Sequence, residues 1–433
     1  MSKNRFKRMR QIGLAALVLA FVLAGAGRAM IMTVKGPTFN LTATDDWIQT
    51  PEGGAYYMFG YANSGGGGMG GMGMGMPRMS YPGPTLDVNE GDFVTVNLTN
   101  NLTVPVSIVF PGQTGVMAMG DSNGVMTAEA DPNGGMATYT FVASHPGTYL
   151  YHSGTNPELQ IEMGLLGALI VRPAGQPQGE NWAYNHADSA YDFETLFLLT
   201  EIDPVIHDLA ACGMWDQIDL TEYWPVYWFI NGRCAPDTML MADHPLLPTQ
   251  PHDCMPRIHP GEKLLMRVIG GGRDLHPFHT HGNNFLMIAQ DGRLLSGVAG
   301  ADLAVSDFTL AVAPGGTYDA IFSWTGAGLG WDMYGHDPND PLVDGEYAPD
   351  HGKPIPVTLP TAQQDLTFGA FYSGSPYLGG MGTLPPGEGG MNMNGGFFYM
   401  WHSHNEKEMV NNDIFPGGLM TMFIVEPHGV PIE

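Results

Sequence analysis

The sequence has few charged residues, and few of these are basic. Charged side chains make up 14% of the 433 residues, so we do not expect long amphipathic helices. Seventeen basic residues against 43 acidic ones give a formal net charge of −26, which argues against nucleic acid and anionic lipid as partners. The 60 glycines and 34 prolines instead predict many short strands and turns, and hence a mostly β fold.

Cysteine is also scarce, which argues against redox and zinc sites built from cysteine pairs. Only Cys212, Cys234 and Cys254 occur, and none of them belongs to a Cys-x-x-Cys motif. A thioredoxin-like or zinc-ribbon role is therefore disfavoured. In an oxidising compartment one disulfide and one free thiol could form, with three pairings open.

Two catalytic templates are absent, and a third fits poorly. The sequence has neither a phosphate-binding loop nor a His-Glu-x-x-His motif. Ser403, His404 and Glu408 could suggest a hydrolase, but on an extended strand Ser403 points away from His404. We do not expect hydrolase chemistry here.

No apolar run is long enough to span a membrane. Residues 12–23 are apolar, follow a basic stretch with Lys3 and Arg5, and precede the small residues 24–26. This pattern predicts a signal peptide over residues 1–29, and hence an exported protein, periplasmic or extracellular. Its removal would take away six basic side chains and lower the net charge to −32.

Two histidine clusters are the most informative feature of the sequence. They are the stretches His276-Pro-Phe-His279-Thr-His281-Gly and His402-Ser-His404. On a β-strand, residues i and i+2 point to the same face, so each His-x-His brings two imidazoles together. Imidazole is a ligand for copper, zinc, iron and nickel. The clusters therefore predict a metal site.

An internal repeat divides the sequence into two halves. The stretch 89–98 resembles 260–268, and Val94, Val96 and Leu98 alternate with polar residues as in a half-buried strand. Residues 109–112 then take the place of residues 279–282, and residues 147–154 resemble 396–404. We expect two homologous β-domains at residues 37–173 and 190–428, with a linker at 174–189.

Two insertions interrupt this plan, at residues 65–79 and about 326–395. Both are rich in glycine and methionine, the methionines being Met69, Met72, Met74, Met76 and Met79 in the first and Met381, Met391 and Met393 in the second. Thioethers favour Cu(I), so the loops could gather copper. A flexible glycine loop with incidental methionines explains the first insertion equally well.

These motifs together resemble the multicopper oxidases, in the two-domain, laccase-like form built from cupredoxin domains. The residues that carry the resemblance are Pro82-Gly-Pro84, residues 147–152, 164–168 and 231–233, the HPFHTHG motif, and residues 401–404. It covers nearly the whole chain after residue 29. It implies two cupredoxin-like Greek-key β-barrels and copper as the cofactor.

The resemblance also implies a ligand set, and this sequence departs from it. By matched position His279 would bind type 2 copper, and His276 would bind type 1 copper; the ligands of the type 3 pair would be His152, His281, His402 and His404. Three of the eight cluster histidines are replaced, by Val109, Pro111 and Gly154. The remaining five imidazoles suit one or two copper ions rather than three.

The position of the type 1 copper departs further. Ser403 stands where the family has its copper-binding cysteine, Glu408 where it has the second histidine, and Asp413 at the axial position. A serine hydroxyl is neither soft nor ionised near neutral pH. The route by which the cysteine passes electrons to the cluster is therefore lost, and we do not expect laccase-type turnover.

Three functions of different classes remain open. The first is an exported copper-binding protein with a reduced histidine site. The second is a divergent copper oxidoreductase that acts on a small substrate or a metal ion with dioxygen. The third is an extracellular assembly protein on a cupredoxin scaffold, and the family resemblance also implies a homotrimer with sites shared between subunits.

The other histidines lie among glycines, prolines and aspartates. We expect them to be solvated rather than metal ligands. They are His145, His186, His207, His244, His252, His259, His336, His351 and His428.

Overall fold

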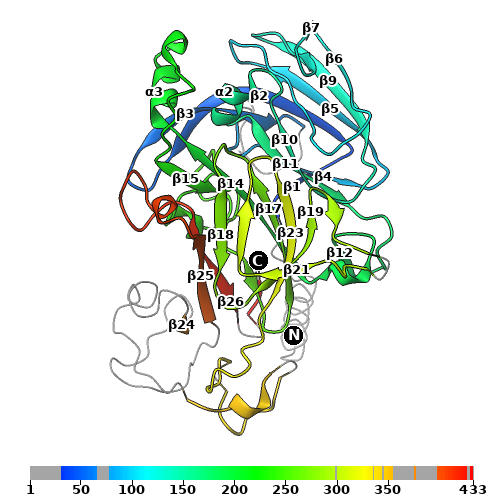
Figure 1. Cartoon of the computed structure of the whole chain (residues 1–433), viewed down its shortest axis with the longest axis vertical. Helices are drawn as coiled ribbons and strands as arrows, with labels where there is room; N and C mark the ends of the chain where they lie inside the picture. Colours follow the sequence, from blue (N-terminus) through cyan, green and yellow to red (C-terminus); the bar gives the residue numbers. More distant parts are fainter. Residues whose placement is uncertain are drawn as a thin grey trace, which may run out of the picture.

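The protein is built from two groups of β-sheets, as seen in a computed structural model (Figure 1). The structure describes residues 31–65, 78–297, 300–334, 336–343, 346–354, 375–376, 397–426 and 430–432. The predicted signal peptide and all but one of the methionines named in the insertions lie outside these residues. Met79 is within them and is buried.

The first group of strands comes from the N-terminal part of the chain. One sheet has the order β1 (Thr33–Lys35), β4 (Thr85–Asn89), β11 (Leu166–Arg172) and β10 (Gly147–His152). The other has the order β3 (Ala55–Asn63), β2 (Thr38–Gln49), β5 (Phe93–Asn100), β9 (Gly135–Val142) and β6 (Met117–Gly120). A small ribbon joins β7 (Ser122–Asn123) to β8 (Ala128–Glu129).

The second group holds both predicted histidine clusters. One sheet has the order β15 (Tyr227–Ile230), β14 (Phe193–Ile202), β17 (Lys263–Gly270), β23 (Thr317–Ser323), β19 (Phe285–Gln290) and β20 (Arg293–Leu294), with β21 (Val305–Asp307) on β19. The other has the order β16 (Arg257–Ile258), β26 (Met420–Val425), β25 (Phe397–Ser403), β18 (His276–Thr280) and β22 (Thr309–Val312), with β24 (Ser375–Pro376) on β25.

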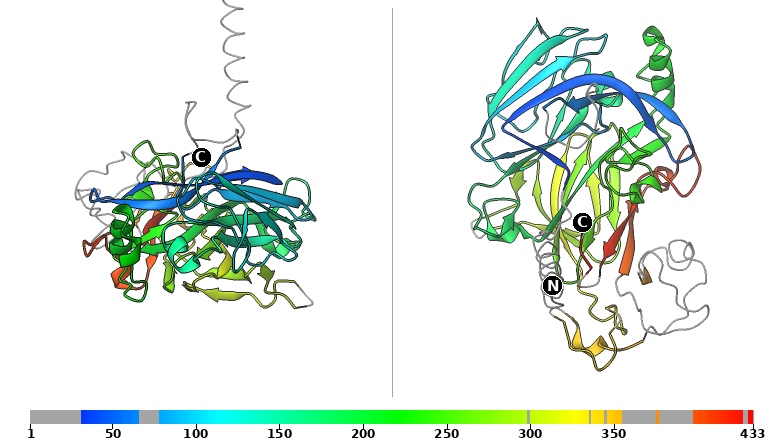
Figure 2. Two further views of the ribbon diagram at one scale, coloured as in Figure 1. Left: turned by 90° about the horizontal axis from the view of Figure 1, so that it is seen from above. Right: turned by 180° about the vertical axis from the view of Figure 1, so that it is seen from behind.

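The helices are short, as the composition predicts. They are α2 (Pro157–Glu162), α3 (Pro204–Ala211), η1 (Ala187–Ser189), η2 (Trp215–Gln217), η3 (Asp237–Met239), η4 (Ala348–Asp350) and η6 (Glu406–Met409). The predicted linker contains part of a small ribbon of β12 (Asn181–Trp182) and β13 (Ala190–Tyr191). Figure 2 shows the first group of sheets and α3 at one end of the molecule, seen from behind.

The predicted strand periodicity is confirmed in β5. Val94, Val96 and Leu98 are buried, whereas the residues between them are half-buried. They pack in the core of the first group, while a separate core with Phe278 and Trp401 fills the second. The domain boundaries themselves stay a prediction.

The internal repeat is visible in the backbone. The matched glycines Gly91 and Gly261 have φ of 90° and 85°, and Gly112 and Gly282 have φ of 84° and 101°. Side-chain-bearing residues rarely adopt this conformation, so glycine is required at the same turns in both halves.

The structure resolves the open question about the cysteines. All three are free thiols; Cys212 is exposed, and Cys234 and Cys254 are buried. The Cys254 thiol donates to the carbonyl oxygen of Ile230 at 3.0 Å. Among the described residues, no helix has the length and apolar character needed to cross a bilayer.

Substitution of two glycines should separate backbone strain from steric overlap. A Cβ at Gly261 would meet no atom within 4 Å, so Gly261→Ala should cost about 1–2 kcal/mol through its φ alone. A Cβ at Gly232 would overlap the backbone carbonyl of Tyr81, so Gly232→Ala should cost about 1–3 kcal/mol more. Urea unfolding measures both, and equal losses would contradict the contact between Gly232 and Tyr81.

Candidate metal centre

The centre is built on the antiparallel pairing of β18 with β25. His279 lies directly opposite His402, while Phe278 lies opposite Ser403. Because side chains alternate along a strand, His279 and His281 share one face with His402 and His404. The buried rings of Phe278 and Trp401 occupy the other face and pack into the core. The spacing of the histidines thus places four imidazoles on one surface of the sheet.

These four imidazoles are close together. The Nε2 atoms of His281 and His402 are 3.1 Å apart, and ligand atoms of His279, His281 and His402 all lie within 4.8 Å of one another. The exposed ring of His404 lies against that of His279, with their centroids 4.9 Å apart. Two nitrogens that bind one cation at about 2.0–2.1 Å lie about 3 Å apart, so this spacing suits a shared ion.

Hydrogen bonds on the far side of the rings orient them. The Nδ1 of His402 donates to the carbonyl oxygen of Ser403 at 2.7 Å, so its Nε2 carries the lone pair in the neutral ring. The Nδ1 of His279 is hydrogen-bonded to the hydroxyl of Thr309 at 2.7 Å. The indole of Trp401 donates to the backbone carbonyl of His281 at 3.0 Å. Sequence reasoning missed Thr309, which lies 30 residues from its partner.

Burial keeps two rings of the centre uncharged. Burial and then the neighbouring rings of His281 and His404 lower the pKa of His279 to about 4. Burial outweighs the hydrogen bond to Ser403 and lowers the pKa of His402 to about 4. Both rings are therefore neutral at pH 7, which is the form that binds a metal ion.

His152 is not part of this group. It pairs with Val109 across a β-bridge, just as His402 pairs with His279. Its Nδ1 donates to the carbonyl oxygen of Ser153 at 2.8 Å, which repeats the contact between His402 and Ser403. The predicted correspondence of the two halves thus extends to this pair, but His152 lies in the other group of sheets.

His276 also lies apart from the four, because it precedes His279 and His281 by an odd number of positions and so points to the other face of the strand. It is fully buried, and its ring is held between two carboxylates: Nδ1 is 3.0 Å from Glu408 Oε2, and Nε2 is 3.0 Å from Glu201 Oε2. Burial opposes the charged ring, but these hydrogen bonds outweigh it and raise the pKa of His276 to about 10. The ring is an imidazolium and offers no lone pair to a metal ion.

Ser403 belongs to the same buried network. Its hydroxyl donates to Glu408 Oε2 at 2.6 Å and accepts from the backbone N–H of Asn405 at 3.1 Å. Asp413, by contrast, is exposed and has a φ of 64°. The family resemblance placed His276, Ser403 and Glu408 together. It gave no signal for Glu201, which comes from β14.

For four of the remaining histidines, the structure corrects the expectation that they are solvated; His145 is exposed, as expected. His207 is fully buried and is hydrogen-bonded through Nδ1 to the carbonyl of Tyr57, and His252 is buried against the carbonyl of Pro82. His336 and His351 are largely shielded and face two acidic side chains. Short sequence windows carried no sign of this burial.

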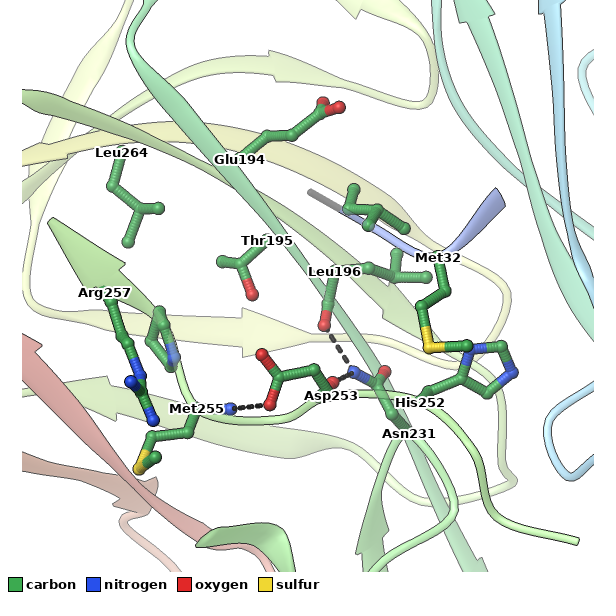
Figure 3. Close-up of a pocket in the computed structure, with 12 residues that line it drawn as sticks. Met32, Glu194, Thr195, Leu196, Asn231, His252, Asp253, Met255, Arg257 and Leu264 are labelled. Carbon is green, nitrogen blue, oxygen red and sulfur yellow. Dashed lines mark hydrogen bonds between the residues drawn. The ribbon is translucent and has the colours of Figure 1, made fainter. Parts of the chain in front are cut away.

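A separate pocket contains none of the predicted site residues. Figure 3 shows its lining, in which Asn231 donates to the backbone carbonyls of Leu196 and Asp253. Asp253 in turn accepts from the backbone N–H of Met255. These bonds engage Asn231 and Asp253 within the protein, and we assign the pocket no function.

Part of this chain is similar to known multicopper oxidases. Residues 76–176 match the family model for multicopper oxidases. The predicted family resemblance is confirmed. L-ascorbate oxidase from Cucumis sativus is 36% identical over 124 residues, which are 28% of this chain and 19% of that protein. Copper resistance protein A from Pseudomonas syringae pv. tomato is 26% identical over 266 residues, 55% of this chain and 41% of that protein. The chain thus spans less than half of these relatives.

Solved structures of multicopper oxidases share the fold. The multicopper oxidase mgLAC gives a TM-score of 0.56 at 20% identity, covering 92% of this chain and 88% of that one. The blue copper oxidase from Nitrosomonas europaea gives 0.55 at 20% identity, covering 90% and 86%. The predicted fold class, mostly β and cupredoxin-like, is therefore confirmed.

The pH dependence of stability should report the charged state of His276. Its pKa is raised from about 6.5 unfolded to about 10 folded, so its contribution is complete below pH 6.5 and is lost as the pH rises through 10. His276→Gln should cost about 3–5 kcal/mol at pH 6 by leaving two buried carboxylates unpaired. Urea unfolding from pH 6 to 10 should show the difference from the unmodified protein shrinking by roughly 1.4 kcal/mol per pH unit. A constant difference would contradict an imidazolium at this position.

Proposed function

We propose that this protein is an exported copper-binding member of the multicopper oxidase family, with a reduced histidine site and no type 1 copper. The observation that carries the proposal is the contrast between the two faces of the β18–β25 pair. Imidazoles converge on one face, where His279 and His402 are neutral, whereas a charged imidazole is bound to carboxylates on the other face.

The donor set of the first face suits copper. Imidazole nitrogens bind both oxidation states of copper, and the family is copper-dependent. His279, His281, His402 and His404 would hold one or two ions, with Thr309 and the Ser403 carbonyl fixing two of the rings. A bound copper ion would supply one-electron redox chemistry at this face.

The second face does not suit copper. Both nitrogens of His276 are engaged by carboxylates, and the hydroxyl of Ser403 donates to Glu408. By the family resemblance, these residues occupy the type 1 position. A buried imidazolium repels a cation, and no thiolate is present to bind one. An electron therefore has no metal relay from this face to the histidines.

His152 would enter the centre from a second copy of the chain. Its Nε2 carries the lone pair in the neutral ring, as that of His402 does, yet it lies outside the group of converging rings. The family resemblance implies trimers that share their sites between subunits. We propose the same assembly here, with His152 as a ligand supplied across the interface.

Copper binding should depend on the four converging histidines. The purified protein should hold one or two copper ions per chain, and His279→Ala with His402→Ala should lower the affinity at least tenfold by removing two ligands. Metal analysis after equilibrium dialysis measures this, with the exposed residue His145 changed to Ala as the control. An intense blue thiolate absorption, or unchanged copper in the double variant, would refute the proposal.

Oxygen uptake distinguishes a copper-binding protein from a residual oxidase. With phenols, Cu(I), Fe(II) and Mn(II) as reductants, the copper-loaded protein should consume no oxygen beyond free copper at the same concentration, because the relay is lacking. Uptake that disappears in His279→Ala would instead establish the oxidoreductase alternative.

The assembly can be tested together with the site. Light scattering should give about three times the mass of one chain, and His152→Ala should lose copper while keeping that mass. A single-chain mass with full copper content would contradict a shared site.

A further inference from the structure

A second group of metal-ligand side chains lies in the segment that follows β23. This segment begins near Trp331, whose ring stacks on Phe397 at the start of β25, with centroids 5.9 Å apart and an interplanar angle of 29°. Trp331 and Met333 are buried in the core of the second group of sheets. The segment lies at the opposite end of the molecule from β5 and β9 (Figures 1 and 2).

Four side chains of this segment point their ligand atoms at one spot. They are Asp332, His336, Glu346 and His351, and these atoms all lie within 4.8 Å of one another. The Nδ1 of His336 is 3.3 Å from Asp332 Oδ2 and 3.2 Å from Glu346 Oε1. The Nδ1 of His351 is 2.6 Å from Glu346 Oε1 and 3.9 Å from Asp332 Oδ2.

The two carboxylates are withdrawn from water. The side chains of Asp332 and Glu346 are only 1% and 2% exposed, and those of His336 and His351 are 18% and 13% exposed. A buried carboxylate requires a cation or several hydrogen-bond donors. The nearby Lys353 is paired with Asp350 instead, at 3.2 Å. With neutral histidines, the cluster therefore carries two negative charges.

The surrounding bonds hold the four ligands in place. Asp332 accepts hydrogen bonds from the backbone N–H groups of Tyr334 and Gly352, each at 2.8 Å. The second carboxylate oxygen of Glu346 accepts from the backbone N–H of Val343 at 3.0 Å. The Nε2 of His351 donates to the carbonyl of Asp340 at 2.9 Å, which leaves the lone pair of the neutral ring on Nδ1. This is the usual outer support of a metal-bound histidine.

We propose that Asp332, His336, Glu346 and His351 bind one divalent transition-metal ion of the zinc class. Four donors at about 2.0–2.1 Å from a tetrahedral ion lie roughly 3.3 Å apart, and the observed separations of 2.6–3.9 Å bracket that value. Two carboxylates neutralise a double positive charge. Four protein ligands leave no open position, so the ion acts structurally, closing the segment from 332 to 351 beside Trp331.

Zinc binding to the full-length protein tests this site separately from the histidine centre. After chelator treatment, the His279→Ala, His402→Ala background should still bind one zinc ion per chain when titrated with zinc chloride. Adding Glu346→Gln or His351→Ala should weaken that binding at least tenfold. Asp340→Asn is the matched control, because it changes an exposed carboxylate of the same segment and keeps its backbone carbonyl.

Cobalt(II) provides a readout that needs no change to the proposed ligands. Bound in place of zinc in the same background, it should show the strong visible absorption of a tetrahedral complex, and one equivalent of zinc should abolish that absorption. The weak absorption typical of octahedral cobalt would overturn the proposal. Zinc binding that survives both ligand substitutions would also overturn it.

Discussion

The register between β18 and β25 is the constraint on which the centre depends. Side chains alternate along both strands, so a shift of β25 by one residue against β18 would turn His402 into the core and bring Trp401 out. The core prevents this, because the Trp401 ring stacks on Phe423 with centroids 4.7 Å apart. Apolar packing thus fixes where the histidines meet, and their own contacts need not hold the strands together.

The same register gives the two faces opposite electrostatic character. Burial without a charged partner makes His279 and His402 neutral, whereas two glutamates make His276 an imidazolium only three residues away along the strand. A histidine in this fold is therefore neutral or charged according to its neighbours. Ser403 lies on the charged side, where its hydroxyl is one more donor to Glu408.

Much of this arrangement could be predicted from the sequence, and the reasons for the failures are physical. Alternation identified β5, and the His-x-His spacing brought together His279, His281, His402 and His404, because both depend on the period of a strand. Glu201 could not be found, because it reaches His276 only through the tertiary packing of β14. The buried state of His207 likewise depends on contacts distant in sequence.

The shielding of His336 and His351, in the second insertion, was not predicted for a related reason. Its glycines, prolines and aspartates predict turns correctly, but turn residues say nothing about whether the turns fold over a common centre. Asp332 and His351 are far apart in sequence and have no shared periodicity. What joins them is the hydrogen bonding of Asp332 to the backbone of Gly352 and Lys353, next to His351. The neighbouring Trp331 stacks on Phe397, at the start of the strand that leads to His402.

The two proposed sites differ in the ions that they select. The histidine centre on β18 and β25 offers imidazole nitrogens alone, a donor set that suits copper. The cluster in the insertion adds two buried carboxylates, which favour a divalent ion and disfavour Cu(I). β25 connects them, since it begins at Phe397 and carries His402 near its end. β26 pairs with β25 from Phe397 to His402, whereas β18 pairs with it only from Trp401 to Ser403. An ion in the insertion would therefore act on the first residues of β25, away from the pairing with β18 that positions the histidines.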